Sequence, residues 1–332
     1  MTQCTTFRLL LFTVFSFIFV TGRASEAFNQ PDTSAVHELT IYAIPSQSEL
    51  DWKSPSSILQ TALESYTQSI FKRYSIPIGH IFIEFSTPLI DSVVLTSITT
   101  APGTDMGRMV LIDKVGLGIL GATFKGRMES SKELQKKINL FGRKKQLAFI
   151  KYRISEEAAL RVKKYLEVFT KKKDGGFSPS GHYGGAFWPR YEYEGAGCSA
   201  FGISAMEIAG LFIDHPEWRV SFNIPMDLVG GNFNNHKKVK ARSIKKRHYW
   251  HDGSGVENVD YIPFTIYDPS LIFNWILKQR ELKGELVPME KNKIPGLYFD
   301  ARKVSISQFE PIFIKRKKPS VFIDIFRKDA HL

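Results

Sequence analysis

The stretch YEGAGCSAFGISAMEIAG (193–210) places a cysteine at the head of a segment whose apolar spacing predicts a helix. A helix N-terminus offers partial positive charge and free N–H groups, which lower a thiol pKa and can hold an oxyanion. Gly195, Ala196 and Gly197 would leave the sulfur open to a substrate carbonyl. Cys198 is therefore a candidate nucleophile; the alternative is a small buried thiol that only packs.

A nucleophilic thiol needs a base, usually a histidine within hydrogen-bond reach. His80 is the first candidate, because it opens the apolar strand HIFIEF directly after Pro77 and Gly79. A polar residue at the head of a core strand tends to face a cleft at the end of the sheet, although a surface histidine would also fit this position. His182, in SGHYGG, is the second candidate for the base.

The elements that must position these residues follow a mixed order. Apolar runs rich in strand formers predict strands at 37–45, 76–85, 91–100, 107–130, 144–154, 217–225, 261–267, 296–304 and 320–326. Helical periodicity and N-cap signals predict helices at 54–74, 155–173, 198–212 and 269–282. Because strands and helices do not alternate regularly, we expect an α+β fold with an antiparallel sheet packed against helices and extra C-terminal strands.

This order resembles the permuted branch of the NlpC-type papain-like cysteine hydrolases, which includes lecithin retinol acyltransferase-like proteins and a group of exported bacterial proteins. In that branch a strand beginning G-H-aliphatic precedes a cysteine at a helix head. Here GHIFIEF (79–85) precedes WPRYEYEGAGCSAFGISA (188–205). The resemblance implies that Cys198 is the nucleophile and His80 the base. It also implies a permuted papain-like domain over residues 28–270, with 271–332 as an extension packed on the same domain.

At the residue that would orient the imidazole, the sequence departs from the family pattern. The family carries it on the next strand, where the interior of DSVVLTSITT (91–100) offers only hydroxyl side chains, among them Ser97 and Thr99. Glu84 shares the parity of His80, but four residues of strand separate the two by about 13 Å. Tyr193 belongs to the aromatic loop before Cys198, where it would either wall the cleft with its hydroxyl near the oxyanion or pack under the loop.

Two other stretches could bind a cofactor or a metal. GLGILG (116–121) matches G-x-G-x-x-G, but no helix opens at its third glycine, so we interpret it as the glycines of a flexible hairpin. His248, His251 and Asp252 could ligate a metal, but the neighbouring lysines repel a cation and a surface loop is the simpler interpretation. We therefore expect no cofactor and no metal.

The N-terminus carries the apolar run LLLFTVFSFIFV (9–20) directly after Arg8, followed by small residues. This pattern predicts a signal peptide over residues 1–27, with cleavage after Ala24 or Ala27, and an uncleaved anchor is the alternative. Cleavage would remove Cys4 and leave Cys198 as the single cysteine. The expected location of the mature protein is the periplasm or the cell envelope.

The chain is basic, with 45 Lys and Arg against 33 Asp and Glu and a formal net charge of +12. The densest cluster lies in KKVKARSIKKRH and contains Lys237, Lys238, Lys240, Arg242, Lys245, Lys246 and Arg247. After export, an anionic envelope surface is a better partner for these cations than nucleic acid. The alternative is that they only keep a loop solvated.

Two functions from different classes remain open at this point. The first is an exported papain-like cysteine hydrolase or acyltransferase, which cleaves or transfers an amide or ester acyl group of a cell-wall peptide or lipid through Cys198 and His80. The second is a binding module on the same fold, with a weak or inactive site and basic loops that hold anionic envelope components. The absence of an obvious orienting residue favours the second, whereas the lone cysteine at a helix head and the strand that begins with His80 favour the first, which is the function we expect.

We predict that the mature protein lacks residues 1 to 24 or 1 to 27, since the small-x-small rule is met at both positions. Intact-mass spectrometry of the protein recovered from cells measures this directly. A full-length mass would mean that the apolar run stays in place as an anchor.

Overall fold

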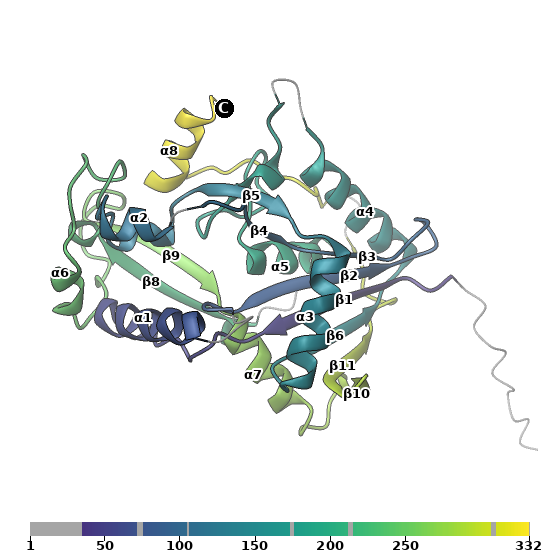
Figure 1. Ribbon diagram of the computed structural model, residues 1–332. Coiled ribbons are helices and arrows are strands. Elements are labelled where there is room, and N and C mark those ends of the chain that lie inside the picture. Colours follow the sequence, from purple (N-terminus) through teal and green to yellow (C-terminus); the bar gives the residue numbers. More distant parts are fainter. Residues whose placement is uncertain are drawn as a thin grey trace, which may run out of the picture. The chain divides into compact units, whose positions relative to one another are not determined.

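The computed structural model describes residues 35–71, 76–104, 106–172, 176–211, 215–306 and 310–331, which belong to one compact unit (Figure 1). The predicted signal peptide, with Cys4 and both cleavage positions, lies outside these residues. In the described part of the chain, every helix is too short or too polar to cross a membrane.

A six-stranded sheet forms the centre of the unit, in the order β10-β11-β6-β1-β2-β3. Its strands are β1 (Glu38–Ile44), β2 (His80–Ser86), β3 (Val94–Thr96), β6 (Ala148–Arg153), β10 (Val287–Lys291) and β11 (Ile294–Asp300). All neighbouring pairs are antiparallel except β11 and β6, which run parallel. The α+β class and the antiparallel-dominated sheet packed against helices are therefore confirmed.

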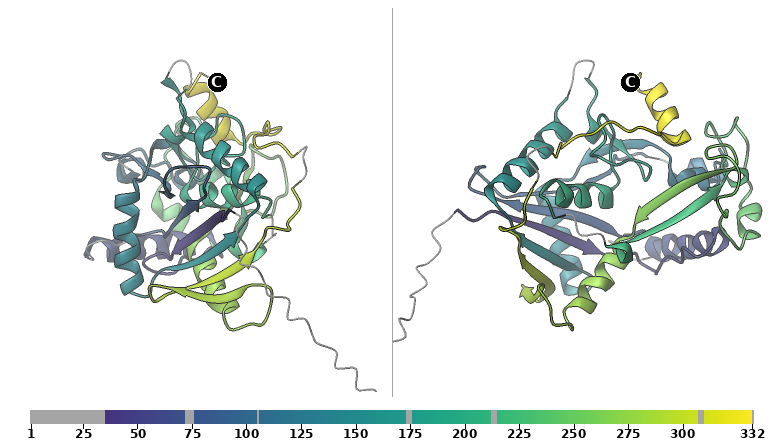
Figure 2. Two further views of the ribbon diagram at one scale, coloured as in Figure 1. Left: turned by 90° about the vertical axis from the view of Figure 1, so that its right-hand side faces the viewer. Right: turned by 180° about the vertical axis from the view of Figure 1, so that it is seen from behind.

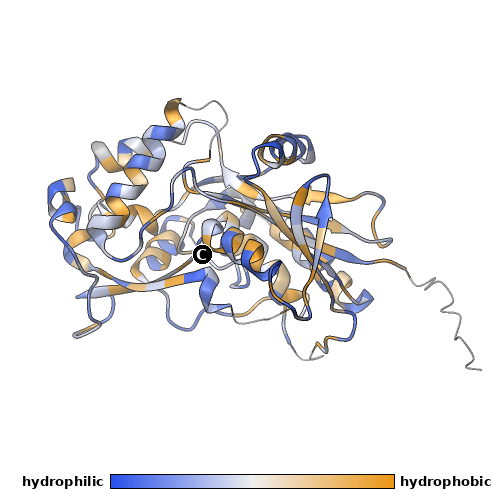
Figure 3. Ribbon diagram, turned by 90° about the horizontal axis from the view of Figure 1, so that it is seen from below, coloured by the Kyte–Doolittle hydropathy of each residue, from blue (hydrophilic) through white to orange (hydrophobic). Residues whose placement is uncertain are grey.

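Both faces of the central strands are buried, and the period of two divides their side chains between two cores. Leu39, Ile41 and Ala43 of β1, with Ile81 and Ile83 of β2, pack against one group of helices. These helices are α4 (Glu156–Thr170), α5 (Cys198–Ile208) and α7 (Pro269–Gln279). The intervening side chains, such as Tyr42 and Phe82, pack against α3 (Ser131–Arg143) on the other face. Figure 3 shows the central strands as largely hydrophobic.

Two smaller sheets complete the unit. One has the order β4-β5-β7, from β4 (Ile98–Thr100), β5 (Phe124–Met128) and β7 (His182–Tyr183), and the other pairs β8 (Arg219–Pro225) with β9 (Tyr261–Tyr267). The chain passes from the large sheet to the first small one at Ser97, between β3 and β4. Around the small sheets lie α1 (Pro55–Phe71), α2 (Met106–Leu111), α6 (Ala241–Lys245), α8 (Val321–Asp329) and the 3₁₀ turns η1 (Leu117–Leu120), η3 (Pro179–Gly181), η4 (Pro216–Trp218) and η5 (Met226–Leu228).

Two sequence-based predictions of secondary structure were wrong. Residues 107–130 are not one long strand but α2, η1 and β5. Gly116, at φ +59°, interrupts the extended run, and a Cβ there would lie 2.5 Å from the carbonyl oxygen of Leu228. These glycines serve close packing, not a flexible hairpin. Residues 320–326 lie mainly in α8, whose buried Phe322 and Phe326 follow the i, i+4 spacing of a helix. Helix α3 was not predicted at all.

The C-terminal segment between β11 and α8 crosses the loop that precedes α5. Ile314 donates its N–H to the Arg190 carbonyl and accepts from the N–H of Glu192, at 2.8 and 3.0 Å. Arg316 donates two hydrogen bonds, of 2.7 and 2.8 Å, to the buried carboxylate of Glu194. Because a buried charge must be paired, this ion pair ties the C-terminal segment to the loop four residues before Cys198.

Helix α5 lies unusually close to β2, and we predict that Gly202→Ala destabilises the protein. A Cβ at this position would lie 2.6 Å from Cγ2 of Ile81, so either the helix or the strand must move. The expected loss in the free energy of unfolding is about 1–3 kcal/mol, measured by urea denaturation.

The control is Gly284→Ala, because no atom lies within 4 Å of a Cβ at that position and stability should not change. Helix propensity alone predicts the opposite sign for Gly202→Ala, a gain of about 1 kcal/mol. A stabilised Gly202→Ala variant would therefore contradict the close approach of α5 to β2.

Candidate functional site

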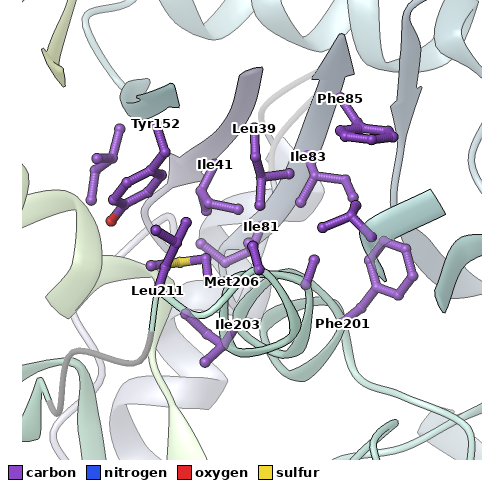
Figure 4. Packing of buried hydrophobic residues seen from close by; sticks show 14 of the residues in the cluster. Leu39, Ile41, Ile81, Ile83, Phe85, Tyr152, Phe201, Ile203, Met206 and Leu211 are labelled. Atoms are coloured by element: carbon purple, nitrogen blue, oxygen red, sulfur yellow. The ribbon is translucent and has the colours of Figure 1, made fainter. Parts of the chain in front are cut away.

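The site forms where the head of β2 meets the head of α5. Figure 4 shows Ile81 and Ile83 of β2 above Phe201 and Met206 of α5, and this packing fixes the helix on the strand. At the N-terminal ends of both elements, the Cys198 thiol and the His80 imidazole meet in hydrogen-bond contact. The structure therefore brings together the two residues that the sequence singled out, 118 positions apart along the chain.

The residue that orients the imidazole is Glu129. Nε2 of His80 donates a hydrogen bond of 2.5 Å to its Oε2, and Nζ of Lys137 donates one of 2.5 Å to its Oε1. An ionised carboxylate only accepts hydrogen bonds, so the ring carries a proton on Nε2. Nδ1 is then the nitrogen left to exchange a proton with the sulfur.

Glu129 is held by the junction between β5 and α3. It is the last residue before Ser130, which caps α3 in a capping box with Glu133. Its N–H donates to the carbonyl of Ser97 at 2.8 Å, and the Ser97 hydroxyl donates to the carbonyl of Ile81 at 2.6 Å. Ser97 therefore connects the backbone of Glu129 to that of Ile81, the residue after His80. The carboxylate that binds the imidazole comes from Glu129.

Two other candidates for the orienting residue lie in different surroundings. Glu84 is near the far end of β2, where it accepts hydrogen bonds from Tyr42 at 3.1 Å and from Lys291 at 2.9 Å. Thr99 is in β4, where its backbone pairs with Arg127 of β5. Neither side chain hydrogen-bonds the ring of His80. For Glu84 the reason is distance, because four residues of strand separate it from His80.

The aromatic loop supplies a different tyrosine from the one expected. Tyr193 is 42% exposed with φ +67°, and its ring lies 6.4 Å from that of Phe177. The His182 ring stacks on Phe177 at 4.9 Å, so the reserve base contacts an aromatic side chain. Tyr183, in β7, is the tyrosine that reaches the site, with its hydroxyl 4.0 Å from Sγ of Cys198.

The glycines before Cys198 let the backbone of residues 195–197 pack closely against β7, which carries Tyr183. Ala196 donates its N–H to the carbonyl of His182 at 3.1 Å, and it forms a parallel bridge with Tyr183. A Cβ on Gly195 would lie 1.9 Å from the same carbonyl oxygen, so only glycine fits there. The GAG stretch before the cysteine is therefore explained by backbone packing, and Cys198 itself is buried, with 8% of its surface exposed.

The surroundings favour a thiolate at Cys198. Burial alone would raise the pKa of the thiol, but the charge and hydrogen bond of His80 lower it, together with the Ile81 N–H and the Tyr183 hydroxyl. The resulting pKa is about 7, down from 9.0. Burial also raises the pKa of Tyr183 well above 10.0, so its hydroxyl stays protonated and can donate to the sulfur.

The imidazole and the carboxylate favour their charged forms as well. Burial would lower the pKa of His80, but the neighbouring thiolate and Glu129 outweigh it and raise that pKa above 6.5. Burial would raise the pKa of Glu129, yet His80 and Lys137 lower it to about 2 from 4.5. At neutral pH the arrangement therefore favours a thiolate, an imidazolium and a carboxylate in a chain.

Sequence reasoning missed Glu129 and Tyr183. The signal for Glu129 was the capping box S-x-x-E at Ser130, which marks the end of β5 and the start of α3. His248, His251 and Asp252 do not come together as a metal site, since the described residues contain no group of three or more His, Cys, Asp or Glu arranged to hold an ion.

We predict that Glu129→Gln raises the pKa of the Cys198 thiol from about 7 toward 9.0. Without the carboxylate the imidazolium is less stable, so the thiolate loses its counter-charge. Alkylation of Cys198 by iodoacetamide, followed across pH on the Cys198 peptide, measures the shift. A rise of about one unit would slow the reaction at pH 7 roughly fivefold.

Glu133→Gln is the matched control, because Glu133 lies at the same end of α3 and binds Arg127 rather than His80. Its pH profile of alkylation should follow that of the wild type. Identical profiles for Glu129→Gln and the wild type would show that the carboxylate does not act on the thiol through the imidazole.

The comparisons with known proteins assign no family to this site. Protein-family models, curated proteins and solved structures contain no match to this chain. The likeness to permuted NlpC-type hydrolases therefore depends on the residues themselves: the strand-head His80, the helix-head Cys198 and their order along the chain. What the site does is accordingly a proposal.

Proposed function

We propose that the protein is a cysteine hydrolase or acyltransferase that cleaves an amide or ester through an acyl-enzyme on Cys198. The observation that supports this most is the chain of contacts from Glu129 through His80 to the thiol at the start of α5. A thiol with a lowered pKa, a histidine base and a group that orients the base are the parts that nucleophilic catalysis requires.

In the first half-reaction the Cys198 thiolate attacks the substrate carbonyl and forms a C–S bond. The oxyanion that develops lies near the first N–H groups of α5, whose capping residue Gly197 has no side chain to occupy them. The Tyr183 hydroxyl, 4.0 Å from the sulfur, is a further hydrogen-bond donor at the site. Collapse of the tetrahedral intermediate breaks the C–N or C–O bond, and Nδ1–H of His80 protonates the leaving group.

In the second half-reaction Nδ1 of His80 removes a proton from the acceptor as it attacks the thioester. Water as the acceptor gives hydrolysis, and another hydroxyl or amine gives acyl transfer. The C–S bond then breaks, and the thiolate and imidazolium are restored. Glu129 keeps Nε2 protonated through both steps, so that Nδ1 is always the nitrogen that exchanges the proton.

The alternative function, a binding module with an inactive site, was favoured by the lack of an orienting residue. Glu129 supplies a side chain suited to that task, and this supports the enzyme over the alternative. The apolar run at 9–20 supports export, which makes a cell-wall peptide or an acyl lipid of the envelope the proposed source of the acyl group.

We predict that p-nitrophenyl acetate acetylates Cys198, because an activated ester needs only the nucleophile and the oxyanion donors. The acetyl group is located by peptide mapping, which separates Cys198 from Cys4. Cys198→Ala should abolish the adduct on that peptide. His80→Gln should slow its formation by about 10²-fold or more, the usual contribution of a general base.

His182→Gln is the matched control, since His182 stacks on Phe177 and is the competing candidate for the base. It should acetylate at the wild-type rate. Loss of acetylation in His182→Gln together with a normal rate in His80→Gln would reassign the base, and no acetylation of the wild type would count against the enzyme.

A further inference from the structure

The basic cluster at 237–247 forms part of a shaped surface rather than a featureless loop. Arg242, Lys245, Lys246 and His248 line a depression of about 650 Å³. The side chains of Lys237, Lys238, Lys240, Arg242, Lys245 and Lys246 are exposed, whereas Ile244 of α6 is buried and anchors the segment in the core beneath. Arg247 lies over the exposed ring of Tyr249 at 5.9 Å. Cations and an aromatic ring therefore share this face.

Helix α1 lies beside the depression. Ser56 donates its N–H to the carbonyl of Arg247 at 2.9 Å and its hydroxyl to the carbonyl of Lys245 at 2.9 Å. Figures 1 and 2 show α1 and α6 side by side at one end of the unit. The side of α1 that carries Ser56 is thus the side against which the basic segment packs.

The same side of α1 continues as an exposed apolar row. Seven residues make almost two full helical turns, so Ser56, Leu63 and Ile70 lie in one line along the helix. Leu63 is 55% exposed and Ile70 79% exposed, and Phe71 beside them is 83% exposed. The row therefore leads from the basic depression along the helix, and nothing in the described part of the chain covers these side chains.

We propose that this surface, the depression lined by α6 and the apolar row of α1, docks the protein on an anionic phospholipid bilayer. Basic side chains next to exposed aliphatic ones are the signature of interfacial binding, in which cations meet headgroups and apolar groups enter the acyl boundary. A wall polymer or a nucleic acid would be held by the cations but would leave Leu63 and Ile70 in water, so the apolar row favours lipid.

The proposal does not depend on the activity of the site. Ser65, on the buried side of α1, donates its hydroxyl to the carbonyl of Pro77 at 2.5 Å, three residues before His80. The exposed row therefore lies on the side of α1 away from β2. The formal net charge of +12 assists the approach to an anionic surface.

The test is sedimentation of the full chain with vesicles of phosphatidylglycerol and phosphatidylcholine, against vesicles of phosphatidylcholine alone. Residues 1–34 are present in every sample. Their contribution to binding therefore cancels when the partition coefficient of one variant is divided by that of another. Lys245→Gln/Lys246→Gln should weaken binding to the anionic vesicles about thirtyfold at low salt, at about 1 kcal/mol for each basic residue. Arg247 is left intact, because it is paired with Asp227.

Leu63→Gln/Ile70→Gln should weaken binding to the same vesicles about tenfold or more at both low and high salt, because apolar burial is not screened. The control for the lysine variant is Lys132→Gln/Lys136→Gln, which changes two exposed lysines of α3. The control for the apolar variant is Leu160→Gln, which changes an exposed leucine of α4. Both controls should bind like the wild type. Thermal melting of each variant confirms that it is folded.

Three results would overturn the proposal. The first is equal binding of the wild type to anionic and neutral vesicles. The second is a lysine variant that binds like its α3 control. The third is a Leu63→Gln/Ile70→Gln variant that binds vesicles like Leu160→Gln, which would leave only a polyanion contact; retention of that variant on purified cell-wall sacculi would then identify the polymer as the partner.

Discussion

A carboxylate that is only 5% exposed must be compensated, and the pairing of Glu129 determines the chemistry of the whole site. Lys137 neutralises one oxygen and the Nε2–H of His80 occupies the other, so the charge is stable only while the imidazole keeps this orientation. That orientation turns Nδ1 toward Cys198 and favours a thiolate there. One buried charge thus links α3, β2 and α5.

The rest of the fold supplies the distances that this chain of contacts needs. Gly202 lets α5 approach β2 closely enough for a helix-head thiol to reach a strand-head imidazole. Ser97, at the passage between the large and the small sheet, ties the backbone of Glu129 to that of Ile81. The ion pair of Glu194 and Arg316 ties the loop before Cys198 to the C-terminal segment. Three contacts far apart in sequence therefore converge on one site.

That Cys198 and His80 belong to one site could be predicted from the sequence, because a cysteine after glycines at a helix head and a histidine at a strand head are local patterns. Glu129 could not, since its place depends on the crossing of two sheets at Ser97, which no local pattern encodes. The capping box at Ser130 would still have marked where β5 ends. The α+β class could be predicted from the order of the elements. The apolar run SVFIDIF (320–326), rich in strand formers, led to a strand prediction where Phe322 and Phe326 are buried with the i, i+4 spacing of helix α8.

The central claim is that Cys198, His80 and Glu129 stabilise one another's charged forms, and an NMR pH titration of the His80 ring nitrogens tests it most directly. Burial would lower the pKa of His80, but the charge and hydrogen bond of the Cys198 thiolate, together with the hydrogen bond to Glu129, raise it above 6.5 in the wild type. Removing the sulfur in Cys198→Ala leaves burial and the charge of Lys137 to act against the imidazolium, so the ring should lose its proton at a lower pH than in the wild type. An unchanged titration of His80 in Cys198→Ala would contradict the account.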